Sequence, residues 1–369
     1  MRHQVDVFVI GGGPAGLAAA IAASQKGLSV IVADGCAPPV DKTCGEGITP
    51  ESVAALRELG ISLAHGEGFR FRGIRFLQNG ASVSADFPVG FGIGCRRPLL
   101  HEKLIARAEK SGAHLLWKTP VTGMDAEGVF AGGKKIAARW IVGADGRGSR
   151  VRRWSGLEAA RNNSQRFASR RHYRIRPWSE FMEIYWGEKS QAYITPVSSE
   201  EVCVVLIAKN PAEVSFAAAL ATLPELRERL AGAELCSRER GAVTISKSLK
   251  NVQCGNVALV GDASGSVDAI TGEGLRLGFH QAFAVADSMQ SGELLSYQRI
   301  HRKLARRPML VARLMLSLGN HSGLRERVFE SFSRNPMLFA KLLAFHVGEG
   351  TPEELLSTSA ALGWQLLAT

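Results

Sequence analysis

Two aspartates in this chain stand at the ends of short apolar runs, where a carboxylate can accept hydrogen bonds from the hydroxyls of a bound nucleotide. Asp34 follows the run Leu28–Ala33, and Asp262 follows a second apolar run after a single glycine. The glycine-rich segment Gly11–Gly16 lies just before the first run. Backbone N–H groups at the start of a helix attract phosphate, because they have no partner within the helix and carry partial positive charge. These residue types together indicate a dinucleotide site.

The elements expected around Gly11–Gly16 complete a strand–helix–strand unit. Asp6–Ile10 predicts a buried strand and Leu17–Lys26 an apolar helix, and a second strand ends at Asp34. In the pattern G-x-G-x-x-G the first glycine allows the tight turn, the second lets the backbone approach a pyrophosphate, and the third lets helix and strand pack closely. The motif alone does not separate NAD from FAD. We expect the pyrophosphate and ribose contacts to come from Gly11, Gly13, Pro14, Ala15, Gly16 and Asp34.

The composition is that of an ordinary globular protein. The chain has 369 residues, of which 46% are hydrophobic and 21% charged, which is enough for two joined domains. The six cysteines are scattered without a C-x-x-C pair, so we expect neither a metal site nor a disulfide framework, and a reducing cytoplasm is the default location. The first expected strand begins close to Met1, so no signal peptide is expected.

The charge balance is strongly basic. The formal net charge is +11, and arginine is concentrated in residues 147–176 and again, with lysine, in residues 299–313. No nucleic-acid recognition motif accompanies these stretches, so nucleic-acid binding is not expected. A solvated basic face is the simplest interpretation. Contact of this face with an anionic membrane surface or with a carrier protein is left open, which allows a peripheral membrane location.

Three further segments share their order and spacing with a known family. They are Arg97–Leu104, which reads R-x-x-L-x-x-x-L, Gly143–Ser149, which reads GADG-x-x-S, and Gly261–Gly265, which is followed by Thr271–Gly274. With the first glycine segment, they resemble the superfamily of FAD-dependent oxidoreductases typified by para-hydroxybenzoate hydroxylase. Within that superfamily the chain is most similar to the geranylgeranyl-reductase-like branch.

The resemblance implies that the dinucleotide is FAD. Arg97 would then lie near the diphosphate, and Asp262 would accept hydrogen bonds from the ribityl hydroxyls. The start of the helix expected at Gly274–Met289 would stabilise negative charge on the reduced flavin ring. The other FAD-binding residues implied by these segments are Asp145, Gly261, Gly265, Gly272, Gly274 and Leu275.

The fold class implied is α/β plus β, with a Rossmann-like FAD-binding domain (GR2-type) interleaved with a β-sheet substrate domain and followed by a helical C-terminal region. Residues 69–94 alternate like a β-hairpin, and one helix near 211–231 interrupts the strands of the middle region. We expect the FAD-binding domain at 1–70, 95–155 and 250–295, the substrate-binding sheet at 71–94 and 156–249, and the C-terminal helical region at 296–369.

The segment Asp41–Pro50 resembles the K-x-C-G-G-x-x-x-P motif of the reductase branch, with Glu46 in place of a glycine. In that branch the stretch lies beside the flavin ring, which implies cofactor contacts from Lys42, Cys44 and Gly45. Cys44 is a candidate catalytic residue, with a redox or a packing role, or it belongs to a structural turn. Glu46 is the second catalytic candidate, because a carboxylate in a flavin pocket could exchange a proton with substrate. The alternative is that Glu46 caps the helix expected to begin near Pro50.

The expected reaction type depends on which residues of the known flavin motifs are absent from this chain. Ser264-Gly265 replaces the Ala-His of the hydroxylase loop, which leans toward the reductase branch. Halogenation is not expected, because no lysine occurs between Lys42 and Lys103 and the strand Gln191–Pro196 has no tryptophan. We favour a monooxygenase that hydroxylates an apolar or phenolic small molecule in specialised metabolism. Reduction of double bonds in an isoprenoid or other lipophilic substrate is the alternative, and a non-catalytic flavin-binding partner of a carrier protein is another.

The electron donor is not encoded in a second nucleotide motif. No further G-x-G-x-x-G unit follows the first one, so NAD(P)H would bind only transiently, or a separate reductase would supply the electrons. Aromatic residues on the candidate strands of the middle region indicate an apolar substrate cavity.

Overall fold

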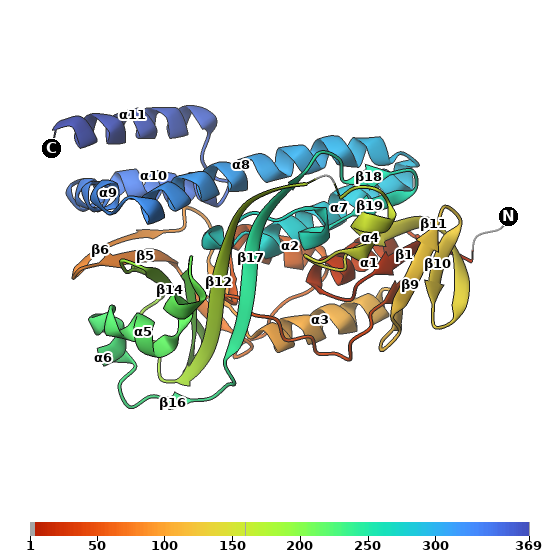
Figure 1. Ribbon diagram of the computed structural model, residues 1–369, viewed down its shortest axis with the longest axis horizontal. Coiled ribbons are helices and arrows are strands. Elements are labelled where there is room, and N and C mark those ends of the chain that lie inside the picture. The colour runs from red at the N-terminus through yellow and green to blue at the C-terminus, as the bar shows by residue number, and fades with distance from the viewer. Residues whose placement is uncertain (1–3, 159, 369) are drawn as a thin grey trace.

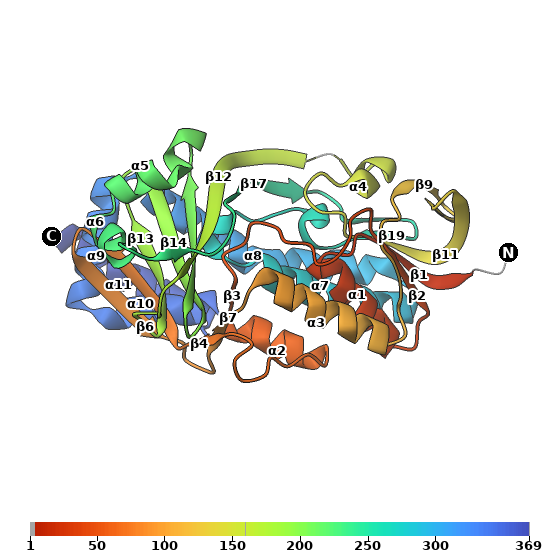
Figure 2. The ribbon, with the colours of Figure 1, turned by 90° about the horizontal axis from the view of Figure 1, so that it is seen from below.

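Two large β-sheets lie side by side along the length of the molecule in the computed structural model, which describes residues 4–158 and 160–368 (Figure 1). The long helix α8 (Leu294–Asn320) extends along them, and the remaining C-terminal helices gather over the second sheet (Figures 1 and 2). This arrangement confirms the mixed α/β and β fold class with a helical C-terminal region. The predicted domain limits stay a prediction, and their end residues 1 and 369 lie outside the described residues.

The first sheet is the Rossmann-like one, with strand order β18-β19-β11-β1-β2-β8. Its central strands pair in parallel, and Val7, Phe8 and Val9 are fully buried, as their continuous apolar run predicts. A hairpin of β9 (Val121–Asp125) and β10 (Gly128–Ala131) adds to β11. The strands of the path are β1 (Val5–Ile10), β2 (Val30–Ala33), β8 (His114–Leu116), β11 (Lys134–Gly143), β18 (Gln253–Cys254) and β19 (Val257–Leu259).

Helix α1 (Pro14–Gln25) begins at Pro14 rather than at Leu17, because proline suits the first position of a helix. It packs against α3 and α7. Close packing at its start depends on Gly16, where an added Cβ would lie 1.9 Å from the carbonyl oxygen of Gly11. The helices that accompany this sheet are α2 (Pro50–Glu58), α3 (Arg97–Lys110), α4 (Arg150–Trp154) and α7 (Gly274–Ser291).

The second sheet has the strand order β16-β12-β15-β14-β13-β5-β6, with β17 paired to β12. Its strands are mostly antiparallel, but β5 and β13 pair in parallel and so join residues far apart in sequence. The bounds are β5 (Gly73–Gln78), β6 (Ala81–Asp86), β12 (Ala160–Arg174), β13 (Phe181–Trp186), β14 (Ser190–Ser198), β15 (Glu201–Ala208), β16 (Glu234–Leu235) and β17 (Arg240–Leu249).

Both faces of the second sheet are buried. Along β15, Cys203 and Val205 belong to the apolar cluster under the C-terminal helices, while Val204 and Leu206 belong to the cluster on the opposite face. This alternation is the two-residue period of a strand. On the first face Phe76 meets Phe339 with ring centroids 4.8 Å apart. The helices that cover this face are α9 (Ser322–Arg334) and α10 (Pro336–His346), followed by α11 (Pro352–Ala368).

Residues 69–94 form more than the expected hairpin. Only β5 and β6 pair in that way. In a separate three-stranded sheet, β7 (Gly92–Gly94) is the central strand and pairs with β3 (Gly47–Ile48) and with β4 (Phe69–Phe71). The cause is close packing of β7 against β14, since a Cβ on Gly94 would lie 1.7 Å from the carbonyl oxygen of Pro196.

The prediction of a single helix near residues 211–231 is also wrong in detail. The structure has η1 (Pro211–Val214), α5 (Phe216–Ala221) and α6 (Pro224–Arg229), separated by turns. Pro224 cannot continue a preceding helix, because its ring occupies the position of a helical N–H.

Among the described residues, no helix has both the length and the apolar character that crossing a membrane requires. Contact of the basic face with a membrane surface or a carrier protein stays a prediction.

Candidate functional site

The glycine turn before α1 is shaped as the sequence predicts. The Asp34 carboxylate accepts hydrogen bonds from the N–H groups of Gly12 at 2.7 Å and Cys36 at 2.8 Å, which fixes the end of β2 against the turn. A Cβ added to Gly13 would meet nothing within 4 Å, so the backbone there faces open space. Gly13 is also the N-cap of α1 and supplies no side-chain cap. The free N–H groups of the first turn are therefore available to a phosphate.

Histidine 101 holds this turn in place, although no sequence motif pointed to it. Its Nδ1 accepts the N–H of Val40 at 3.1 Å, so Nε2 carries the proton and donates to the carbonyl oxygen of Gly12 at 2.7 Å. Burial lowers the pKa of His101, which keeps the ring neutral as this pattern requires. The only signal in the sequence was the helical spacing, which puts this histidine on the apolar face of α3. The structure shows that it is fully buried there.

Lys42 and Asp262, separated by 220 positions in the chain, meet at the site. The Lys42 ammonium lies 3.0 Å from a carboxylate oxygen of Asp262, and both side chains are partly exposed. Asp262 belongs to η2 (Gly261–Ser264), which begins against α1, because a Cβ on Gly261 would lie 2.7 Å from the Cβ of Ala15. The structure thus brings two predicted cofactor residues together beside the start of α1.

The second glycine loop reaches the same region. Gly272 has a φ of +68°, and neither Gly272 nor Gly274 would have a neighbour within 4 Å of an added Cβ. Gly274 starts α7, next to the half-buried Leu275, and no side chain caps that end of the helix. Gly265 differs, since a Cβ there would lie 2.7 Å from the carbonyl oxygen of Lys247. The close approach of strand β17 therefore accounts for a glycine at this position.

Arg97 and Asp145 have more specific surroundings than their motifs indicated. The Nε of Arg97 is buried and has no hydrogen-bond partner, which suits a residue that binds an anion. Asp145 accepts the N–H groups of Arg150 at 2.6 Å and Val151 at 3.2 Å and so orients the start of α4, while its other carboxylate oxygen is buried without a partner.

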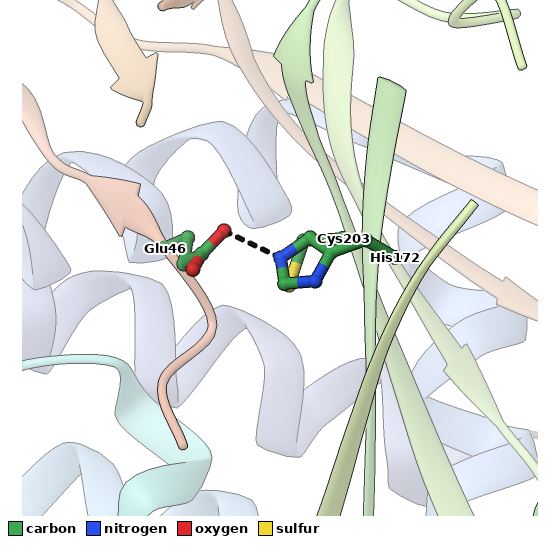
Figure 3. Close-up of side chains that lie close together, drawn as sticks. All are labelled: Glu46, His172 and Cys203. Carbon is green, nitrogen blue, oxygen red and sulfur yellow. Dashed lines mark hydrogen bonds and ion pairs between the residues drawn. The ribbon is translucent and has the colours of Figure 1, made fainter. Parts of the chain in front are cut away.

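Glu46 lies at the centre of a buried polar network that the sequence did not reveal. One carboxylate oxygen accepts from the N–H of Arg97 at 3.0 Å and from the guanidinium of Arg170 at 3.1 Å. The other oxygen lies 2.8 Å from Nε2 of His172, whose Nδ1 lies 2.8 Å from the hydroxyl of Ser237 (Figure 3). The side chains of Glu46 and His172 are fully buried. Glu46 therefore has no face open to solvent.

The network fastens residues 41–49, which we call the strap, to strands β12 and β17. Arg170 also binds both carboxylate oxygens of Asp41 at 2.9 Å, and Arg240 lies 2.7 Å from the same carboxylate. Burial raises the pKa of Asp41, but the hydrogen bond and positive charge of Arg170, followed by Arg240, outweigh it and lower the pKa overall. The two arginines thus favour the ionised form of Asp41 and tie the strap to both strands.

The prediction that Glu46 caps the following helix is wrong. Thr49 is the N-cap of α2, and the Glu46 carboxylate instead accepts the backbone N–H of Arg97 at the start of α3. Glu46 has a φ of +59°, a conformation that glycine adopts readily and that costs other residues about 1 kcal/mol or more. This explains why the motif it resembles has a glycine at this position, and it shows that the buried contacts of Glu46 hold a strained backbone.

Cys44 and Cys203 flank this network. The Cys44 sulfur accepts the N–H of Glu46 at 3.4 Å and remains half-buried, whereas the Cys203 thiol is fully buried and donates to the carbonyl oxygen of Cys44 at 3.8 Å. Burial, and then the negative charge of Glu46, raise the pKa of Cys203 well above its usual range. One ligand-type atom each from Glu46, His172 and Cys203 lies within 4.8 Å of the others (Figure 3). Arg170 already binds the carboxylate, so this group works as an ion-pair network.

These features fit FAD. Open backbone at Gly13, Gly272 and Gly274 lines a path between the starts of α1 and α7, where an added Cβ would meet nothing. The unpaired Nε of Arg97 and the ion pair at Asp262 supply partners for phosphate and for hydroxyl groups. Both helix starts present their positive ends to this path.

Comparison with known proteins agrees with this geometry. The family model described as "FAD binding domain" matches residues 4–291. A menaquinone reductase from Mycobacterium tuberculosis is 27% identical over 317 residues, which cover 79% of this chain and 78% of the relative. A digeranylgeranylglycerophospholipid reductase from Methanopyrus kandleri is 30% identical over 297 residues, with coverage of 74% and 76%.

A solved structure of a flavoprotein/dehydrogenase from Cytophaga hutchinsonii superposes with a TM-score of 0.82 over 99% of each chain, at 17% identity. At that identity the likeness shows the fold. The two sequence relatives carry the names of reductases, so they do not confirm the preference for hydroxylation.

Proposed function

This chain belongs to the FAD-binding-domain family of flavin-dependent oxidoreductases, and from that premise we propose that it reduces a carbon–carbon double bond in a lipophilic, isoprenoid-type substrate. The observation that carries the proposal is the similarity, across about three quarters of the chain, to a menaquinone reductase and to a digeranylgeranylglycerophospholipid reductase. Both names imply an isoprenoid substrate. The matched family model spans residues 4–291, which include every residue of the flavin site described above.

FAD bound along this path supplies the hydride when its ring is reduced. The chain's own groups would hold it: the start of α1 at Gly13 would bind the pyrophosphate, Asp34 the ribose, and Asp262 with Lys42 the polyol chain. The positive end of α7 at Gly274 stabilises the negative charge of the reduced ring. The electrons would come from NAD(P)H that binds transiently or from a separate reductase.

Reduction of a double bond also needs a proton, and Cys44 is the candidate donor in the strap. Its sulfur is half-buried, while Glu46 and Cys203 are fully buried. Glu46 is a positioning residue in this proposal, since its carboxylate accepts a hydrogen bond from the guanidinium of Arg170 and so holds the strap to β12. We expect Cys44→Ser to lower turnover by roughly tenfold or more, because a hydroxyl gives up its proton far less readily than a thiol. The matched control is Cys36→Ser, because Cys36 is exposed.

The test of the proposal is the mass of the product. FAD-loaded protein is supplied with NADPH or dithionite and with a menaquinone or a digeranylgeranyl phospholipid, in parallel under argon and in air. Reduction adds two hydrogen atoms and proceeds without oxygen. Hydroxylation, which the sequence analysis favoured, adds one oxygen atom and requires air. A protein that binds FAD but shows no turnover with any donor would be a flavin-binding partner and would overturn the proposal.

A further inference from the structure

A basic pocket lies beside the flavin loop and outside the site described so far. Its volume is about 260 Å³, and it lies where the middle of β12, the start of β14 and the end of β15 meet the C-terminal end of α8 and the start of α9. Its lining includes four basic and two acidic side chains, so its charge is positive. These residues are Arg166, Lys189, Lys209, Arg325, Glu188 and Glu213.

Arg166 is the buried cation of this pocket and is incompletely paired. Only 7% of Arg166 is exposed. Its Nη2 donates to the side-chain oxygen of Gln191 at 3.2 Å, and its Nη1 lies 3.5 Å from a carboxylate oxygen of Asp268. Both Nε and Nη1 are buried without a hydrogen-bond partner. A guanidinium has five N–H donors, and buried donors without a partner cost folding free energy. Arg166 is therefore suited to bind a hydrogen-bond acceptor in the pocket.

Arg325 gives the pocket a second buried guanidinium. It is 4% exposed, and it is held from behind by the side-chain oxygen of Gln78 at 3.2 Å and the carbonyl oxygen of Leu318 at 3.3 Å. Its guanidinium carbon lies 5.8 Å from the ring centre of Trp186. Its hydrogen-bond partners are neutral, and the carboxylates of Glu326 and Glu188 act on it through charge alone, while burial lowers its pKa. Lys189 and Lys209 are exposed at the rim, where they can attract an anion from solution.

The pocket is connected to the flavin loop through the chain itself. Ile270 lines it and stands two positions before Gly272. Asp268, which pairs with Arg166, accepts the N–H of Ile270 at 3.1 Å, and the hydroxyl of Tyr193 donates to the carbonyl oxygen of Ile270 at 3.0 Å. Ile270 belongs to the apolar cluster between the second sheet and the C-terminal helices. Ile270 and Leu316 give the pocket an apolar wall, against which an apolar chain can pack.

We propose that this pocket binds an anionic group, a phosphate or a carboxylate, at the end of the lipophilic substrate, with Arg166 and Arg325 as the binding guanidiniums. The proposal rests on the proposed function, since it names the polar end of the substrate that the flavin site would reduce. Arg166 and Arg325 supply paired N–H donors of the kind that recognise phosphate and carboxylate.

The test measures binding to FAD-loaded protein by calorimetry, without turnover. The probes are octyl phosphate, 1-octanol and inorganic phosphate, which separate the anion from the chain. We expect octyl phosphate to bind roughly tenfold or more tighter than 1-octanol, and Arg166→Gln to remove most of that difference. The matched control is Arg174→Gln, because Arg174 lies on the same strand and its ion pair with Glu234 is exposed. Arg174→Gln should bind as the unmodified protein does.

A second variant keeps the test open if Arg166→Gln fails to fold. The double change Lys189→Gln with Lys209→Gln alters only exposed residues at the rim, and it should weaken octyl phosphate roughly threefold or more while leaving 1-octanol unchanged. Equal binding of octyl phosphate and 1-octanol would overturn the proposal, and so would unchanged affinity for octyl phosphate in the double variant. Binding of inorganic phosphate alone, with no gain from the octyl chain, would mean a free-anion site and would also overturn it. None of these results depends on flavin turnover, so they leave the proposed reaction to its own test.

Discussion

Replacement of Glu46 tests whether the buried network holds the strap or takes part in proton transfer. Two substitutions separate the contributions. Glu46→Gln keeps the shape and the strained φ of +59° but removes the charge, while Glu46→Gly removes the whole side chain and suits that backbone conformation. A glycine at this position would therefore be stabilising if backbone strain decided the outcome.

The magnitudes follow from the contacts. Glutamine can still accept the N–H of Arg97 through its oxygen, but its bond to Arg170 loses the negative charge, which costs about 2 kcal/mol of unfolding free energy. Glycine leaves Arg170 and His172 without that partner in a buried site, which costs about 3–5 kcal/mol, and relief of the backbone returns about 1 kcal/mol. Glu46→Gly should thus lose about 2–4 kcal/mol against about 2 kcal/mol for Glu46→Gln, which makes it the less stable variant by up to about 2 kcal/mol.

The assay is urea unfolding of the FAD-loaded protein, with apparent free energies compared at equal flavin content. Glu200→Gln is the matched control, because Glu200 is exposed and its change should alter stability by about 0.5 kcal/mol or less. A Glu46→Gly protein as stable as the unmodified one would refute the network's role. Turnover supplies the second readout: a direct proton-transfer role predicts that Glu46→Gln lowers the rate by roughly 10²–10⁴, and a positioning role predicts a much smaller change in properly folded protein.

Three further predictions concern the flavin cradle and its surroundings. Gly13→Val should fold and lose FAD, since an added side chain meets only open space there. Gly16→Ala should fail to fold stably, because its Cβ would overlap a carbonyl oxygen. Circular dichroism and flavin absorbance of both variants check these outcomes. Asp262→Ala should weaken FAD binding roughly tenfold or more through the loss of charge-assisted hydrogen bonds, while Asp287→Ala, which breaks an exposed ion pair on α7, should leave the dissociation constant of FAD unchanged in equilibrium dialysis. Burial lowers the pKa of His301 to about 4, below the value near 6.5 of the unfolded chain. Because the unfolded state then binds the proton more readily, stability is lost as the pH falls from about 6.5 to about 4. His301→Gln should flatten that part of the pH profile of the melting temperature, and an unchanged profile would contradict the burial effect.

Local spacing was sufficient to predict the glycine turn and its distal acid. Gly11–Gly16 and Asp34 lie within one strand–helix–strand unit, so short-range pattern fixes their geometry, and the structure joins Gly12 to Asp34 by a hydrogen bond. Lys42 and Asp262 were each assigned to the cofactor through the resemblance to a family, which did not predict their ion pair. Only the tertiary fold brings these two residues together. Their individual roles toward FAD stay predictions.

The network around Glu46 lay beyond sequence reasoning for a physical reason. Arg170 and His172 lie two positions apart, and so on one face of β12, in a stretch whose many arginines indicate a basic surface. The strap covers that face of the strand. Which face of a strand is covered depends on long-range contacts. The same reason explains β7, whose pairing with β3 and β4 depends on close packing of Gly94 against Pro196 from another sheet.

The measurement that tests the central claim most directly is an anaerobic single turnover. FAD-loaded protein is reduced by a stoichiometric amount of dithionite and mixed under argon with the isoprenoid substrate, while the flavin absorbance is followed and the product is analysed by mass. The account predicts that the flavin is reoxidised by the substrate in the absence of oxygen, with one double bond reduced for each flavin. Flavin that stays reduced until air is admitted, and then yields a product with an added oxygen atom, would contradict the account.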